Sequence, residues 1–173
     1  AGWRAPSCRA AAFRASLRDR STPRSRSSRY PRFAETASAA DPGPTPGPKD
    51  RCGVCGMYVA KYPQWIASVW FADGTVVFFD GPKDMFRYLL DLGTFKPGAT
   101  SEQVTAVFVT DYYSTRPIDG RAASYVIGSD VMGPMGAELV PTADPDHAET
   151  LLKDHAGKRI VSFGEVTAEL VKP

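Results

Sequence analysis

Short runs of β-branched and aromatic residues, separated by turn sequences, dominate the chain from Trp65 onward. The runs at 65–71 and 75–79 flank Asp73-Gly74 and therefore predict a β-hairpin. Residues 104–110 predict a longer strand, because polar and apolar side chains alternate along a segment rich in β-branched residues. Further extended segments are predicted at 124–128, 138–141 and 159–163, and the segment 165–171 is predicted to be either a helical turn or extended.

Two other segments show helical spacing of their apolar residues. The first predicts a helix at 82–91, with Asp80 as its N-cap and Gly93 at its end. The second predicts a helix that is capped by Asp144 and closed at Gly157. Because helices and strands are interleaved unevenly and hairpins predominate, we expect an α+β fold with a small, mostly antiparallel sheet and two helices.

The first 50 residues differ from the rest in charge. They carry nine Arg and one Lys against four acids, whereas residues 51–173 carry 11 basic and 15 acidic side chains. The Arg- and Ser-rich part is typical of a transit peptide, of upstream sequence outside the native chain, or of a disordered tail, and the Pro-rich part predicts a semi-rigid tether. We therefore predict a disordered basic tail and Pro-rich tether at 1–50 and one domain at 51–173. The acidic balance of this domain argues against nucleic-acid binding, which needs a basic surface.

Sulfur side chains are concentrated in two glycine-containing segments. The segment 52–57, Cys-Gly-Val-Cys-Gly-Met, holds three of them, and Met132 and Met135 lie in a second segment, Met-Gly-Pro-Met-Gly. Thiolate and thioether ligands select soft metal ions, so these residues together indicate a copper(I) site. A redox-active cysteine pair, half of a zinc site and a structural disulfide stay open as alternatives, because the spacing alone does not distinguish them. Cys8 is isolated in the basic tail and is interpreted as an incidental thiol.

The two histidines are less well placed for a shared ion. His147 and His155 fall eight residues apart on the second predicted helix, which separates them by about 80° around its axis. Each is expected to face solvent or to cap the helix, and His155 is favoured as a cation near the helix C-terminus. Met85 lies on the apolar face of the first predicted helix and is expected to be a core residue.

Four segments occur in a recognisable order along the chain. They are 52–65, which starts with the two cysteines, Phe-Phe-Asp-Gly-Pro-Lys-Asp-Met-Phe at 78–86, Gly-Ser-Asp-Val-Met-Gly-Pro-Met-Gly-Ala-Glu at 128–138, and His-Ala-Gly-Lys-Arg-Ile at 155–160. Together they resemble the NosL family, the accessory proteins of nitrous oxide reductase. The resemblance covers essentially all of residues 51–173.

This resemblance implies a periplasmic copper(I) chaperone, usually a lipoprotein, that helps to mature the copper centres of nitrous oxide reductase together with a membrane ABC-type transporter complex. It also implies an α+β fold related to that of organomercurial lyase, and a binding protein and not an enzyme. The alternative functions are a thiol–disulfide oxidoreductase and a metal-independent accessory subunit. The fold relation also suggests a mercurial lyase, in which Asp80 and the two cysteines would have to form a mercury site. The N-terminal segment shows neither a signal-sequence pattern nor a lipidation cysteine, so membrane association is expected only through a lipid anchor that this segment does not show.

The copper ligands implied by motif position are Cys52, Cys55, Met57, Met132 and Met135, with His155 from the last segment. Cys55 and Met135 rank first among them. We expect the two cysteines and at least one methionine of the second segment to lie together in the fold, although about 75 residues separate them. The last segment departs from the family pattern at Ala156, which stands where the first of two glycines is expected.

Residues 1–48 are expected to be dispensable for metal binding, because they lack apolar periodicity. Limited proteolysis should remove them first and leave a fragment that retains copper(I). A protease-resistant segment within 1–48, or loss of copper on its removal, would contradict the domain boundary.

Overall fold

The computed structural model describes Gly2 and residues 45–172. The tail and most of the tether predicted at 1–50 lie outside the described residues, as does Cys8. The described end of the tether, residues 45–50, forms hydrogen bonds within itself and to the domain. Gly47 N donates to the Asp50 carboxylate at 2.7 Å, and the Asp50 carbonyl accepts from Val59 N at 3.1 Å.

A four-stranded antiparallel sheet forms one half of the domain. Its order is β2-β1-β3-β4, and its strands are β1 (Ala67–Phe71), β2 (Val76–Phe79), β3 (Val104–Thr110) and β4 (Pro117–Asp119). The predicted hairpin is confirmed as β1 and β2. Its turn is held by a hydrogen bond from Thr75 N to the Asp73 carboxylate at 2.8 Å.

Five further strands make up the other half. Three of them form an antiparallel sheet in the order β8-β5-β9, with β5 (Ser124–Ile127), β8 (Val140–Thr142) and β9 (Arg159–Ser162). The remaining two, β6 (Met132–Gly133) and β7 (Gly136–Ala137), pair only with each other. The α+β class with antiparallel pairing is thus confirmed, but the strands are divided among three sheets.

The helices number three in the described residues, one more than predicted. They are α1 (Pro82–Leu90), α2 (Leu92–Phe95) and α3 (Pro145–Asp154). Gly93 does not end the first helix as predicted, because Asp91 ends α1 and its carboxylate then accepts from Thr94 N to begin α2. The prediction that Asp80 caps α1 was also wrong, since the N-cap is Gly81 and has no side chain to donate or accept. The predicted cap of α3 is confirmed, with the Asp144 carboxylate accepting from Asp146 N.

Short 3-10 helices occupy the remaining turns. They are Val59–Lys61, Pro63–Trp65, Ser101–Gln103 and Phe163–Glu165. The segment 165–171, predicted as a helical turn or extended, contains the end of the last 3-10 helix followed by turns.

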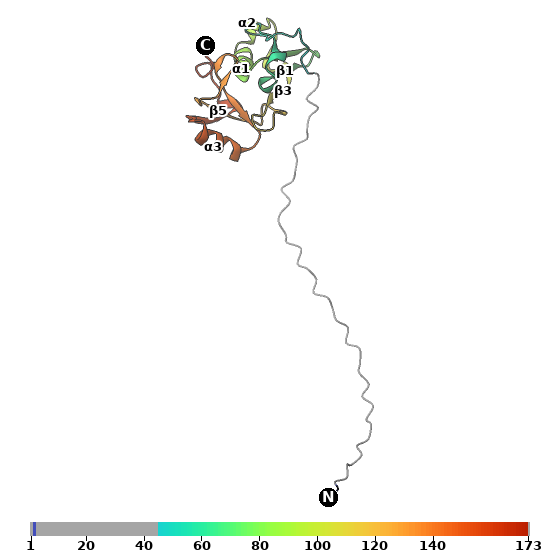
Figure 1. Cartoon of the computed structure of the whole chain (residues 1–173). Helices are drawn as coiled ribbons and strands as arrows, with labels where there is room; N and C mark the ends of the chain where they lie inside the picture. Colours follow the sequence, from blue (N-terminus) through green and yellow to red (C-terminus); the bar gives the residue numbers. More distant parts are fainter. Residues whose placement is uncertain (1, 3–44, 173) are drawn as a thin grey trace. The chain divides into compact units, whose positions relative to one another are not determined.

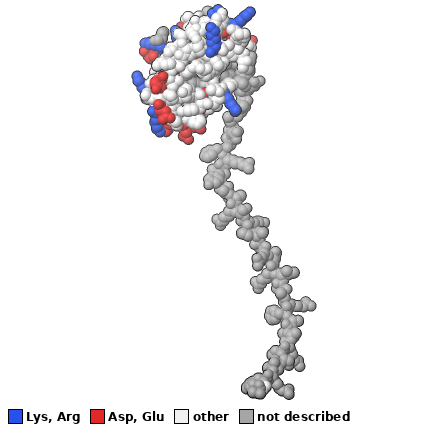
Figure 2. Space-filling view, viewed as in Figure 1, with Lys and Arg blue, Asp and Glu red and all other residues white. Residues whose placement is uncertain are grey.

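Each main helix packs on a different sheet. Helix α1 contacts β1 and β2, whereas α3 contacts β5, β8 and β9, and Figure 1 shows these two helices on opposite sides of β5. Met85 on α1 is fully buried, which confirms its predicted core position. On the face drawn in Figure 2, acidic and basic side chains are interspersed, mostly toward the edge, and no continuous basic surface is visible there.

Two small residues, Ala156 and Gly157, end α3 for different reasons. Ala156 has a φ of +50°, and Gly157 N then donates to the Leu152 carbonyl at 2.8 Å, which closes a Schellman motif. Gly157 is needed for a different reason, because an added Cβ would lie 2.7 Å from Val126 and 2.9 Å from the Leu152 side chain. The left-handed position is therefore held by alanine, which tolerates it poorly.

Replacing Ala156 with glycine is expected to stabilise the domain by about 1 kcal/mol, since the left-handed conformation costs an L-residue more than it costs glycine. Urea denaturation monitored by circular dichroism would measure the gain. The control is Ala148→Gly inside α3, which should destabilise by more than about 1 kcal/mol, since it also removes a fully buried methyl group. A lower midpoint for Ala156→Gly would contradict the strain at this position.

Candidate functional site

The segment Cys52–Met57 forms a tight loop that is docked on β2. Cys52 N donates to the Met57 carbonyl at 2.8 Å, and Gly53 N donates to the Phe78 carbonyl at 3.0 Å. An added Cβ on Gly53 would lie 2.6 Å from Val77, so this approach to the strand needs glycine. The loop thus brings both cysteines to the end of β2, where α1 begins.

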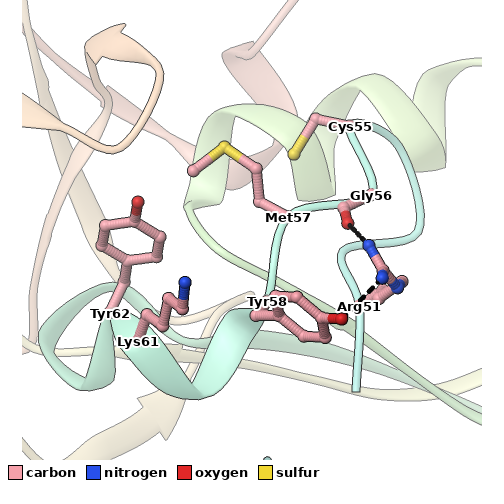
Figure 3. Close-up of a pocket in the computed structure, with 7 residues that line it drawn as sticks. All are labelled: Arg51, Cys55, Gly56, Met57, Tyr58, Lys61 and Tyr62. Atoms are coloured by element: carbon pink, nitrogen blue, oxygen red, sulfur yellow. Dashed lines mark hydrogen bonds between the residues drawn. The ribbon is translucent and has the colours of Figure 1, made fainter. Parts of the chain in front are cut away.

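Arg51 closes the open side of this loop. Its guanidinium donates to the Gly56 carbonyl at 2.9 Å and to the Tyr58 hydroxyl at 2.7 Å, and it lies 4.1 Å from the centre of the Tyr58 ring. A backbone bridge pairs Arg51 with Tyr58 as well. The turn that carries Cys55 is therefore fixed on both flanks, and Figure 3 shows these contacts.

Two carboxylates face the two thiols. The Cys52 thiol donates to the Asp84 carboxylate at 3.4 Å, and the Cys55 thiol lies 3.4 Å from both oxygens of Asp80. One ligand atom from each of the four residues lies within 4.8 Å of all the others. Asp80 directly follows β2 and Asp84 lies in the first turn of α1, so one strand-to-helix junction supplies both carboxylates.

Burial keeps both thiols protonated at neutral pH. It raises the pKa of Cys55 to about 11, with further raising contributions from Asp84 and Asp80, while a hydrogen bond with the Met57 backbone lowers it. Burial raises the pKa of Cys52 still further above its usual range, and an Asp80 carboxylate beside it acts in the same direction. Both cysteines are free thiols. A metal ion that binds here must therefore displace thiol protons.

This arrangement can bind a metal ion but is poorly suited to thiol exchange. Thiolates bind soft monovalent ions, and two thiolates with two carboxylates also have the number and type of donors that zinc uses. Redox-active Cys-x-x-Cys motifs lower the pKa of the attacking thiol, often at a helix N-terminus. Here the pKa of both thiols is raised, and the loop leads into the 3-10 helix Val59–Lys61 and not into an α-helix.

Asp80 and Asp84 were not predicted as copper ligands. The motif placed Asp80 before a helix, where a cap is the ordinary role, and an aspartate in a first helical turn is commonly explained by the helix dipole. The available signal was their separation of four residues, which keeps both carboxylates close to the start of the same helix. Only the long-range contact with Cys52 and Cys55 reveals their role.

Met57 lies beside Cys55 at the surface. Both residues line a pocket of about 280 Å³, and Figure 3 shows their sulfur atoms on the same side of the loop. The other residues that line the pocket are Arg51, Gly56, Tyr58, Lys61 and Tyr62. Cys52 is 4% exposed, so Cys55 and Met57 are the sulfur donors next to the pocket while Cys52 lies behind them.

Met132 and Met135 lie in the hairpin formed by β6 and β7, Met132 in the first strand and Met135 in the two-residue turn. They are 62% and 40% exposed, which agrees with a segment that presents them outward. The hairpin contacts α1 through Lys83, whose Nζ lies 3.3 Å from the Met135 carbonyl. That either methionine shares an ion with Cys55 stays a prediction.

The histidines lie at opposite ends of α3, His147 in its first turn and His155 at its C-cap. His155 is the C-cap residue of α3, and its Nδ1 lies 2.9 Å from an Asp130 oxygen while its ring contacts that of Tyr112. His147 packs on the Tyr113 ring at 4.8 Å between centroids. Among the described residues, the group of potential metal ligands holds Cys52, Cys55, Asp80 and Asp84 without His155. That His155 is a metal ligand stays a prediction.

A family model and two solved structures relate this chain to known proteins. The family model described as NosL matches residues 45–171. The copper chaperone NosL from Shewanella denitrificans is similar in structure, with 24% identity, coverage of 73% of this chain and 96% of that chain, and a TM-score of 0.62. The solution structure of the apo-NosL protein from Achromobacter cycloclastes is 21% identical over 61% of this chain and 87% of that chain, with a TM-score of 0.43. No curated protein matches.

In the described residues, none of the helices has the length and apolar character needed to cross a membrane.

The raised pKa of Cys55 predicts slow alkylation that accelerates about tenfold for each pH unit between pH 7 and 10, because the reactive thiolate increases by that factor below the pKa. Mass spectrometry of metal-free protein treated with iodoacetamide would follow Cys55 separately from Cys52. Asp80→Asn removes a charge that raises this pKa and should speed the reaction at pH 8, whereas Asp146→Asn on α3 should not. A rate that levels off near pH 9, as for an ordinary thiol, would contradict the assignment.

Proposed function

This chain belongs to the NosL family, and on that premise we propose that it is a copper(I) chaperone that delivers its ion for maturation of the copper centres of nitrous oxide reductase. The observation that carries the proposal is the approach of Cys52 and Cys55 within 4.8 Å of each other, with Met57 next to Cys55 at the same pocket. Two thiols thus lie close together, and a thioether lies beside the one that borders the open pocket. The similar fold of a copper chaperone from Shewanella denitrificans supports it.

Copper(I) is the cargo, and sulfur donors suit it best. Cys52 and Cys55 would supply thiolates, and Met57 would add a thioether from the same loop, with Met135 or Met132 as a further donor from the hairpin. Each thiol that binds the ion loses its proton, so the metal-free protein holds neutral thiols and the loaded protein holds thiolates. The two carboxylates then face the thiolates, and their negative charge favours a site that stays occupied by a cation.

Delivery requires that the ion leave through the exposed side of the site. An incoming sulfur or imidazole of the acceptor can approach through the pocket beside Cys55 and Met57, whereas Cys52 is buried behind them. Ligand exchange would add the incoming donor before a resident thioether leaves. Because thioethers are neutral and bind more weakly than thiolates, Met57 and the hairpin methionines are the ligands that exchange first.

The partners of this activity would be nitrous oxide reductase and the ABC-type complex of the same maturation system. A periplasmic location, with membrane association through a lipid anchor, completes the proposal. Catalysis is not part of it, since the raised pKa of each thiol disfavours disulfide exchange at neutral pH. The metal-independent accessory role is the alternative that copper titration would test directly.

Loss of single sulfur atoms should lower copper(I) affinity without unfolding the protein. Cys55→Ser is expected to weaken copper(I) binding more than about 100-fold, and Met135→Leu about tenfold. Substitutions of residues that only support a metal ligand already lower metal affinity about 10- to 100-fold. Leucine conserves the volume of the methionine, so folding should survive. Anaerobic titration against a competing copper(I) chelator would give the affinities.

The matched control for this experiment is Met85→Leu, because Met85 is a fully buried core methionine on α1. That variant should bind copper(I) like the wild type. If Cys55→Ser and Met135→Leu also bind like the wild type, the ligand assignment is wrong. If the wild type binds no copper(I), the chaperone function itself is wrong.

A further inference from the structure

Glu138 is a buried carboxyl group outside the thiol cluster. It is 5% exposed, and its Oε1 accepts from Lys83 N at 2.6 Å and from Leu139 N at 3.1 Å. Lys83 N belongs to the first turn of α1, where backbone N–H groups have no partner within the helix. Burial raises the pKa of Glu138 to about 8, and Oε1 can accept both bonds whether or not the carboxyl carries a proton.

Two glycines make room for this carboxyl group. An added Cβ on Gly81 would lie 2.5 Å from Glu138 Oε2, and one on Gly133 would lie 3.0 Å from the same atom. Gly81 is the N-cap of α1, and Gly133 belongs to β6. The carboxyl group is therefore inserted between the start of α1 and the hairpin that carries the exposed methionines.

Lys83 makes the second connection between the same two elements. Its side chain is directed to the hairpin, where Nζ donates to the Met135 carbonyl at 3.3 Å and to the Ala137 carbonyl at 3.1 Å. Lys83 is only 8% exposed and forms no ion pair among the described salt bridges. One residue of α1 thus binds Glu138 through its backbone and the hairpin through its side chain.

These contacts lie in the turn that also faces the thiols. Lys83 stands between Asp80 and Asp84, whose carboxylates contact Cys55 and Cys52. The hairpin itself is two residues long on each strand, too short to be stable alone. Its position relative to the cysteines therefore depends on what attaches it to α1.

We propose that Glu138 and Lys83 are positioning residues that hold the methionine hairpin beside the cysteine loop, so that Met132 and Met135 can add a thioether to an ion held at Cys55. Holding the hairpin in place before the ion arrives removes the entropy cost of ordering it on binding. This inference rests on the proposed copper(I) function. It adds that the methionine contribution requires an intact contact between Glu138 and α1.

A double-mutant cycle in the full chain tests whether Glu138 acts through the methionines. The variants are Glu138→Ala, Met132→Leu with Met135→Leu, and all three changes together, each titrated anaerobically with copper(I) against a competing chelator. Glu138→Ala should weaken binding about tenfold in the wild type and less than about twofold when both methionines are leucine. Glu138→Gln keeps an oxygen that accepts from Lys83 N and should bind nearly as the wild type does, as should the control Glu149→Ala on the exposed side of α3.

A metal-free measurement keeps the inference independent of copper binding. Hydrogen exchange should show faster exchange at Gly133 and Gly136, the pair next to the two-residue turn, in Glu138→Ala and in Lys83→Leu, with α3 unchanged. Equal exchange in the hairpin, equal copper affinity, or the same loss of affinity with and without the methionines would overturn the positioning role. If the wild type binds no copper(I) while the hairpin exchanges faster in the variants, the chaperone function fails and the attachment of the hairpin stands.

Discussion

The hydrogen bonds between one buried thiol, one partly buried thiol and two buried carboxylates organise this domain around one junction. Cys52 and Cys55 come from a loop before the first sheet, and Asp80 and Asp84 come from the junction between β2 and α1. A buried carboxylate is costly without a hydrogen-bond donor, so the thiols of Cys52 and Cys55 stabilise Asp84 and Asp80 in the absence of metal. The remaining features of the site are arranged around this contact.

The same contact determines how the site responds to an ion. Neutral thiols can donate to carboxylates, whereas thiolates beside carboxylates would repel them unless a cation were present. An empty site therefore keeps its protons, because burial raises the pKa of each thiol and the nearby carboxylates act in the same direction. A cation replaces those protons and restores the charge balance. Binding and release are in this way linked to proton exchange at Cys52 and Cys55.

Local sequence signals predicted the elements whose cause is local. The Asp73-Gly74 hairpin, the strand Val104–Thr110 and the Asp144 cap of α3 were all confirmed, because each depends on residues close together in the chain. The errors arose where a local signal had two uses. Asp80 has the spacing of a cap but accepts from a thiol, and Gly93 follows a helical run but continues into α2, because Asp91 starts a new turn.

The sequence by itself determined the family, the α+β class and the concentration of sulfur donors in Cys52–Met57, because motif spacing and side-chain periodicity are properties of short segments. Tertiary structure decided which carboxylates face the thiols and how Glu138 and Lys83 join the hairpin to α1. Those partners lie 25 to 55 residues apart. Contacts over such distances depend on how the sheets and α1 pack together, which no local pattern of residues encodes.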